Sequence, residues 1–288
     1  MLLSVIIPIG NLKKDFQNLE KITSEIPKSN VEVIFVIDTP EELAMTKLRN
    51  LCNQMELSNY QAIQSMARNP GGSRNLGIRV AKGEWLIFCD SDDRPNFSNM
   101  IYEIKKNKDK SDVLVGSYEI ENSKHGSVSK MRFDGSINHI WETISLNPGI
   151  WRWLIRKVEI SDMTFPNLSM GEDQYFILKL LNKNPKIKFS NRIFYTYRLG
   201  STSSLIGSKK NLSDLVKILE LEFSLSKFSK KHEKVKNYFI IRQLLTLLKH
   251  GNFTDKFRAL KFFIILISKV PLVEYFSVMK FTTRLLRG

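Results

Sequence analysis

The first hundred residues alternate between short apolar runs and amphipathic stretches, and this alternation restricts the fold more than any other feature. The apolar runs cover residues 2–9, 31–37 and 85–89, and a further short strand is predicted near 60–66; the helical stretches cover 15–26, 41–57 and 73–81. An apolar run without polar alternation is typical of a strand that is covered on both faces. The pattern therefore predicts an α/β fold, with a mostly parallel, doubly wound sheet flanked by helices.

Sheets of this kind bind ligands at the carboxyl ends of their strands, near a switch in strand order. Asp38 follows the second apolar run, where its carboxylate can accept a hydrogen bond from a base or a ribose. Arg68 and Arg74 carry forked donors, and Gly71-Gly72 lets a phosphate approach the backbone at a helix start. Each element alone is common in ordinary loops. Their coincidence with strand ends favours a nucleotide diphosphate site.

Three acids follow the apolar run 85–89, in the turn Asp90-Ser91-Asp92-Asp93. Turns often contain a capping aspartate, but a plain turn needs only one. Three carboxylates within four residues repel one another, and a divalent cation or a cation bound to a diphosphate relieves that repulsion. On spacing alone, a turn and a metal site are both open interpretations.

A second acidic pair, Glu172-Asp173, begins the helix predicted from Met170 to Leu181. The helix dipole favours acids in a first turn, so capping is the simplest interpretation of this pair. The stretch 148–157 is apolar with interleaved arginines. It predicts either a strand or a core segment whose arginines extend toward solvent.

The C-terminal part of the chain is basic and helical in pattern. Residues 207–288 contain 17 of the 44 lysines and arginines but only 6 of the 29 acids, in a chain of net charge +15. Apolar side chains at helical spacing predict helices over 212–223, 235–248 and 257–270. The segment Lys261–Lys269 fits either the headgroup region of a membrane or a small helical subdomain packed on the sheet. We predict a catalytic domain over 1–206 and a helical extension over 207–288.

Composition narrows the class of protein further. The hydrophobic content of 42% is sufficient for a large core, and two cysteines, Cys52 and Cys89, do not suggest a disulfide framework. The N-terminus lacks the basic start and the cleavage site of a signal peptide, and no uncharged run reaches the roughly 18–20 residues that span a bilayer. A cytoplasmic protein is therefore expected.

Taken together, the motifs resemble the family-2 glycosyltransferases with the Rossmann-like GT-A fold, of the bacterial surface-polysaccharide type. The resemblance covers about Leu3 to Leu205. It is carried, in order, by Ser4–Pro8, the strand end at Asp38, Gly72–Gly77, Ala81–Trp85, Phe88–Asp93, Gly171–Phe176 and Tyr195–Arg198. Chance agreement of these blocks in this order is improbable.

The resemblance implies a role for each matching residue. Asp38 would contact the base of the nucleotide, and Asp90 would lie at the ribose or in the metal shell. Asp92 would ligate Mn²⁺ or Mg²⁺, with Asp93 close by. Asp173 would be the catalytic base, with Glu172 beside it to position the acceptor. The remaining residues expected at the nucleotide are Pro8, Ile9, Arg68, Arg74, Ser91 and Arg198.

The activity implied is an inverting transfer of a sugar from a nucleotide-diphosphate sugar, a UDP-sugar, to a hydroxyl of a glycan or lipid-linked glycan. The acceptor class would be a surface polysaccharide such as capsule or lipopolysaccharide, at the inner face of the cell membrane. The anionic membrane surface would be a partner, and nucleic acid would not. The sequence departs from the family at Gly10, where an aromatic residue is common, and at Thr39-Pro40-Glu41, where more acid is usual.

Other classes fit less well. A sugar-phosphate nucleotidyltransferase needs a glycine-rich loop after the first strand, but Ile9-Gly10-Asn11 has a single glycine. A phosphatase of the aspartyl-phosphate type needs an aspartate where Pro8 stands. A basic adaptor for nucleic acid or membrane agrees with the charge, but few aromatic residues interleave with the basic ones at the strand ends.

Overall fold

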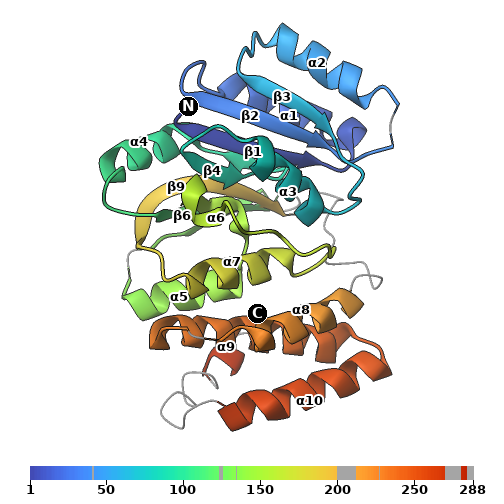
Figure 1. Ribbon diagram of the computed structural model, residues 1–288, viewed down its shortest axis with the longest axis vertical. Coiled ribbons are helices and arrows are strands. Elements are labelled where there is room, and N and C mark those ends of the chain that lie inside the picture. Colours follow the sequence, from blue (N-terminus) through green and yellow to red (C-terminus); the bar gives the residue numbers. More distant parts are fainter. Residues whose placement is uncertain are drawn as a thin grey trace. The chain divides into compact units, whose positions relative to one another are not determined.

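The computed structural model describes residues 1–40, 42–122, 126–133, 135–199, 212–226, 228–269 and 280–283. It forms two compact units (Figure 1). The sheet unit comprises Met1–Asp134, Ile150–Asn167 and Pro185–Ser203, and the helical unit comprises Gly135–Gly149, Leu168–Asn184 and Ser204–Gly288. The segments of the two units thus alternate along the chain. The boundary predicted between residues 206 and 207 lies outside the described residues.

The sheet unit is built on one mixed sheet, with nine strands in the described part of the chain. The order is β3-β2-β1-β4-β8-β6-β9-β5, and β7 pairs with β6. The strands are β1 (Leu3–Ile9), β2 (Val31–Ile37), β3 (Tyr60–Gln64), β4 (Trp85–Phe88), β5 (Arg94–Pro95), β6 (Val113–Asn122), β7 (Ser127–Met131), β8 (Trp153–Arg156) and β9 (Ile187–Leu199). Strands β1 to β4 are parallel, β9 is parallel to β6, and β8 is antiparallel to both of its neighbours. The predicted mostly parallel α/β sheet is confirmed.

The strand order reverses between β1 and β4. From β1 the chain proceeds outward through β2 to β3, and β4 then returns to the other side of β1. Ligands bind at such switch points in open α/β sheets. The connecting helices are α1 (Leu12–Glu25), α2 (Ala44–Gln54), α3 (Pro70–Val80) and α4 (Phe97–Asn107), followed by a 3₁₀ turn (Ile150–Arg152) and the short α6 (Lys157–Ile160).

Helices cover both faces of the central strands, as the unbroken apolar runs require. The odd-numbered residues of β1 pack in one core with apolar side chains of α1 and α2. On the other face Ile6 meets α3, where a Cβ added to Gly77 would lie only 2.4 Å from its Cγ2 atom. A glycine at this position therefore lets α3 approach the sheet closely. This contact places the N-terminus of α3 at the strand ends.

The arginine-containing stretch after residue 148 forms the 3₁₀ turn and β8, so the strand interpretation is correct for Trp153–Arg156. The expectation that its arginines extend to solvent is wrong for Arg152, which is completely buried. Its Cζ atom lies 4.6 Å from the ring centroid of Tyr118 and 5.0 Å from that of Trp151. Burial lowers the pKa of Arg152. Two aromatic faces thus replace water around this cation.

The helical unit contains α5 (Ile137–Leu146), α7 (Glu172–Asn182), α8 (Leu212–Ser224), α9 (Lys230–His250) and α10 (Phe253–Lys269). Helices α8, α9 and α10 coincide with the three predicted amphipathic stretches, and their apolar faces share one core. Helix α5 was not predicted, although Ser136 caps it by accepting a hydrogen bond from the His139 backbone. Over the described residues, none of the helices combines the length and the apolar character that crossing a lipid bilayer requires.

Candidate active site

Three parallel strands end side by side at one edge of the sheet unit. Residues Ile9 and Ile37 are paired in register, and the Asp38 backbone N–H donates to the Ile9 carbonyl at 2.8 Å. On the other side of β1, Ile6 is paired with Phe88, so Asp90 lies near the level of Pro8. The residues predicted to contact the nucleotide at the ends of β1, β2 and β4 are therefore neighbours, as the parallel sheet requires.

Asp38 fastens the loop before α3 to the end of β2. One of its carboxylate oxygens accepts the backbone N–H of Arg68 at 3.0 Å, and the other accepts the hydroxyl of Ser73 at 3.1 Å. The backbone of Arg68 is left-handed, with φ of 55°, and its side chain is exposed. Asn69 then caps α3 by accepting the N–H of Gly72 at 2.7 Å. The start of α3 is thereby held beside the strand ends.

The turn Asp90–Asp93, called the acid turn below, lies beside the buried guanidinium of Arg74. The Nη2 atom of Arg74 is 3.0 Å from the Asp90 carboxylate, and its Cζ atom lies 5.5 Å from the ring centroid of Phe165. The backbone N–H of Asp90 donates to the hydroxyl of Tyr195 at 2.9 Å. One cation and one hydroxyl from distant segments therefore hold the first acid of the turn.

The three acids of the turn have different environments. The carboxylate of Asp93 is buried, with 1% of the residue exposed, and accepts the backbone N–H of Arg198 at 2.8 Å. Burial, followed by the charge of Asp90, raises the pKa of Asp93 well above its ordinary value. Asp90 and Asp92 are partly exposed. The carboxylate of Asp93 thus fastens the turn to β9, while the other two acids remain accessible to a ligand.

Ser91 and Arg198 are also engaged within the fold. The Ser91 hydroxyl donates to the Asp15 carboxylate at 2.6 Å. The Arg198 guanidinium donates to the Asn18 side chain at 3.1 Å and lies 3.5 Å from the Glu121 carboxylate. Both residues support the acid turn through these contacts, and their predicted contact with the nucleotide stays a prediction.

The acid turn offers oxygen donors that suit Mn²⁺ or Mg²⁺. Within the described ranges, no group of three His, Cys, Asp or Glu side chains forms a closed metal cage. Mg²⁺ is commonly held by one or two carboxylates and takes its other ligands from substrate phosphates and water. Asp90 and Asp92 fit that mode of binding, because they are partly exposed at the switch point.

Glu172 and Asp173 lie in the helical unit, in the first turn of α7, whereas the other ten predicted site residues lie in the sheet unit. Gly171 precedes them with φ of +84°, a conformation that side chains disfavour. Glu172 is buried and Asp173 is partly exposed. Behind them, Gln174 accepts a hydrogen bond from Gln243 at 3.1 Å. The predicted base is thus on a helix terminus that its own unit holds firmly.

Two important supports of the acid turn were not identified from the sequence. The Asn18 side chain donates to the carbonyls of Ser91 at 2.9 Å and Asp93 at 2.8 Å. Asp15 receives the Ser91 hydroxyl, and burial raises the pKa of Asp15. Both residues lie on the buried side of α1, three positions apart. Two polar side chains on the apolar face of a predicted helix were the available signal.

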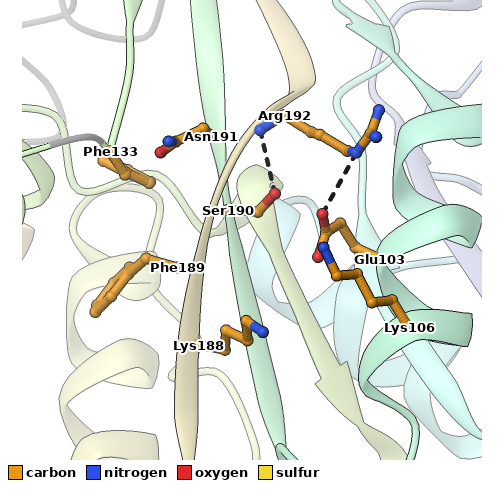
Figure 2. A pocket seen from close by; sticks show the side chains of 8 residues that line it. All are labelled: Glu103, Lys106, Phe133, Lys188, Phe189, Ser190, Asn191 and Arg192. Atoms are coloured by element: carbon orange, nitrogen blue, oxygen red, sulfur yellow. Dashed lines mark hydrogen bonds and ion pairs between the residues drawn. The ribbon is translucent and has the colours of Figure 1, made fainter.

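A hollow of about 440 Å³ lies at the start of β9, beside α4, and contains none of the predicted site residues. Figure 2 shows Phe133, Phe189 and Asn191 on one side of the strand and Arg192 with Glu103 on the other. The Arg192 Nε atom is 3.4 Å from the Glu103 carboxylate. Six residues of strand, roughly 20 Å, separate Arg192 from Arg198 at the acid turn. The hollow is therefore not part of the candidate active site.

Comparison with known families agrees with this geometry. The model of the family described as Glycosyl transferase family 2 matches residues 4–179, more than half of the chain. The chain belongs to glycosyl transferase family 2. The match includes the acid turn and the first turn of α7, but it ends before Arg198 and before α8. The predicted family membership is confirmed.

Several bacterial glycosyltransferases are similar to the chain. Glycosyltransferase GlyG of Streptococcus pneumoniae serotype 4 is 26% identical over 77% of the chain and 80% of its own length. The poly(ribitol-phosphate) β-N-acetylglucosaminyltransferase TarP of Staphylococcus aureus is 24% identical over 93% and 89%, respectively. The poly(ribitol-phosphate) β-N-acetylglucosaminyltransferase TarS of the same species is 26% identical over 81% of the chain, but over only 42% of its own, longer chain.

Solved structures of related folds support the architecture. The crystal structure of S. aureus TarS residues 1–349 in complex with UDP-GlcNAc superposes with a TM-score of 0.70 at 20% identity, over 94% of the chain and 82% of that structure. A mannosyltransferase from Pyrobaculum calidifontis, in complex with GDP-Man and Mn²⁺, superposes with a TM-score of 0.63 at 12% identity, over 99% and 80%. The chain of this family 2 glycosyltransferase has the GT-A-like fold that was predicted.

Proposed function

We propose that this glycosyltransferase is an inverting, metal-dependent enzyme that moves a sugar from a UDP-sugar to a hydroxyl of a polymeric surface glycan. The observation that carries this proposal is the acid turn at the switch point between β1 and β4, with Arg74 paired to Asp90 beside it. A buried cation and two accessible carboxylates at this edge suit a diphosphate and its divalent cation.

The sheet unit would bind the donor. Pro8, which is partly exposed, would line the base pocket at the end of β1 together with the backbone of Ile9, whose side chain is completely buried. Asp38 would accept a hydrogen bond from the base or ribose. Both Asp38 oxygens already accept a hydrogen bond from the loop, so the contact with the donor would use a second lone pair on one of them. Arg68, whose side chain is exposed at the start of α3, would reach the diphosphate as the donor binds.

Charge develops on the leaving diphosphate as the anomeric C–O bond breaks. Mn²⁺ or Mg²⁺ bound at this edge would neutralise part of that charge. Asp92 would be its principal protein ligand, and Asp90, held by Arg74, would complete the shell or contact the ribose. Asp93 would keep the turn in place through its bond to the Arg198 backbone. The acids of one turn therefore divide into ligands and a support.

The acceptor hydroxyl must lose its proton as it attacks the anomeric carbon. Asp173, partly exposed in the first turn of α7, would accept that proton, and the neighbouring Glu172 would position the acceptor. A single base without an enzymatic nucleophile gives one displacement, and hence inversion at the anomeric carbon. The partly exposed carboxylate suits a group that must meet a solvent-borne hydroxyl.

The names of the relatives guide the choice of substrates. TarP and TarS are named poly(ribitol-phosphate) β-N-acetylglucosaminyltransferases, and one TarS structure contains UDP-GlcNAc. UDP-GlcNAc is therefore the first donor to test, and polyol-phosphate polymers are the first acceptors. Capsular and lipopolysaccharide glycans are the next acceptor classes.

Binding and turnover experiments test the donor site and the base separately. Calorimetry of UDP binding, with Mn²⁺ or with EDTA, should show metal-dependent affinity in the wild type. Asp92→Ala should reduce that affinity at least about tenfold, to the level in EDTA. Asp109→Ala, an exposed aspartate of the same unit, should leave it unchanged. Equal metal-dependent affinity in the wild type and Asp92→Ala would refute the metal assignment.

Asp173→Asn should preserve UDP binding and reduce the rate of sugar transfer or donor hydrolysis by about 10²–10⁴-fold. Glu220→Gln is the matched control, because it also converts an exposed carboxylate of the helical unit to an amide. A near-normal rate in Asp173→Asn would show that another group is the base. Binding of nucleic acid without nucleotide binding by the wild type would reject the transferase proposal.

A further inference from the structure

Helix α10 has two apolar faces, and only one of them is packed against its own unit. Ala259 and Leu266 are buried in the core of the helical unit. Phe262 and Phe263 are partly buried against that core, and the Phe262 ring stacks on Phe223 with the centroids 5.3 Å apart. This face attaches α10 to α8 and α9.

The second face is an exposed apolar stripe, formed by Phe253, Phe257, Leu260, Ile264 and Ile267. Their exposed fractions are 86%, 52%, 50%, 62% and 44%, respectively. The spacing alternates between four and three residues, so the five side chains share one face of the helix. The stripe lies away from the packed face, because Ala259 and Leu266 are roughly 120–140° from its centre around the helix and Phe262 is about 180° from it. Such a continuous exposed apolar face indicates an interaction surface.

Basic residues surround the stripe. Lys256 and Lys261 flank it on its two sides, Arg258 is also exposed, and the Lys261 ammonium lies 4.7 Å from the ring centroid of Phe257. The only acid in α10, Asp255, is buried and accepts the backbone N–H of Asn252 at 3.3 Å. All the exposed charges of this helix whose side chains are described are therefore positive.

The charge pattern favours a lipid surface over a second copy of the chain. A coiled coil formed by two such stripes would place the flanking residues of one copy against those of the other. In a parallel pair Lys256 would meet Lys261, and in an antiparallel pair each lysine would meet its own counterpart. Like charges at these positions oppose pairing. An anionic bilayer instead provides apolar acyl chains for the stripe and negatively charged headgroups for the lysines beside it.

We propose that α10 docks on an anionic lipid bilayer, with the apolar stripe at the boundary between headgroups and acyl chains and with Lys256 and Lys261 at the lipid phosphates. This surface would bring the catalytic chain to a membrane-bound acceptor, while the chemistry of transfer stays in the other elements described above. An amphipathic helix of this kind lies in the plane of the interface and does not cross the bilayer.

Vesicle flotation with the full chain tests the proposal. The wild type should float with vesicles of phosphatidylcholine containing about 30% phosphatidylglycerol, and much less with phosphatidylcholine alone. Phe257→Ser/Ile264→Ser should weaken binding at least about tenfold. Lys256→Gln/Lys261→Gln should weaken it about 25-fold, since each lysine near an anionic surface contributes about fivefold. All four side chains are exposed, so circular dichroism should show unchanged folding.

The matched control is Leu43→Ser/Val158→Ser, which removes two apolar side chains of the sheet unit that are 62% and 70% exposed. It should bind the vesicles like the wild type. Absence of flotation by the wild type, or equal flotation by Phe257→Ser/Ile264→Ser, would overturn the proposal. So would a dimer in light scattering that this double variant dissociates, since the stripe would then join two copies. UDP binding should be the same in all these variants, which separates this test from that of the donor site.

Discussion

Glu222 is a completely buried carboxyl of α8, and its environment predicts how the stability of this protein depends on pH. Its Oε1 atom accepts a hydrogen bond from the Gln243 side chain at 2.7 Å, and Gln243 also donates to Gln174 next to the predicted base. Burial raises the pKa of Glu222 from 4.5 to about 8, although the bond from Gln243 and the charge of Lys236 lower it. At neutral pH the native protein therefore keeps this carboxyl protonated.

The sign of the pH effect follows from proton binding. Between pH 4.5 and about 8 the native state holds a proton on Glu222 that the unfolded state has lost. The free energy of unfolding must then fall as pH rises through this window, by about 1.4 kcal/mol per pH unit from this group. The loss between pH 5 and pH 7 is about 3 kcal/mol. Glu222→Gln retains the acceptor oxygen but has no proton to lose, so its stability should not show this decrease.

Urea unfolding at a series of pH values from about 5 to 8 measures the effect. The difference between Glu222→Gln and the wild type should grow with pH, because all other titrating groups are common to both proteins. Glu220→Gln, two residues away and exposed, should follow the wild type at every pH. If the difference between Glu222→Gln and the wild type is the same at pH 5 and pH 7, the carboxyl is ionised when buried and the reasoning fails.

Two further substitutions probe the supports of the candidate site. Gly171→Ala should lower the free energy of unfolding by about 1–2 kcal/mol, because alanine disfavours the positive φ at this position. The close approach of the new Cβ to Ile218, at 3.1 Å, should increase this loss. Gly126→Ala, where φ is also positive but no atom lies within 4 Å of the added Cβ, isolates the backbone part; equal losses in urea unfolding would exclude the contact with Ile218. Asn18→Ala leaves two buried carbonyls of the acid turn without their donor and should cost about 2–4 kcal/mol. It should also weaken Mn²⁺-dependent UDP binding in calorimetry, and an unchanged affinity would show that the turn keeps its shape without Asn18.

Local patterns were sufficient for most of the architecture. Runs rich in β-branched residues predicted the buried strands, including Val31–Ile37 with its observed bounds. A strand that is covered on both faces needs apolar residues at nearly every position, so its sequence does not alternate with polar residues. Helical periodicity likewise located α8, α9 and α10 to within a few residues. Helix α5 was not predicted, since it is only ten residues long and its apolar and polar residues do not follow a clear helical period. The antiparallel β8 also required the structure, because strand direction depends on partners distant in sequence.

Residue types and their order were also enough to predict the family and the place of the candidate site, because parallel strands bring their carboxyl ends to one edge. Only the tertiary structure showed which acids of the acid turn are accessible and which one is buried. Whether a carboxylate is accessible depends on what covers it, and Asp93 is covered by β9, about a hundred residues later in the chain. The same holds for Asn18, whose amide reaches the turn from α1. Helix α10 is a further example: its sequence contains two apolar faces, and only packing shows that one of them remains exposed.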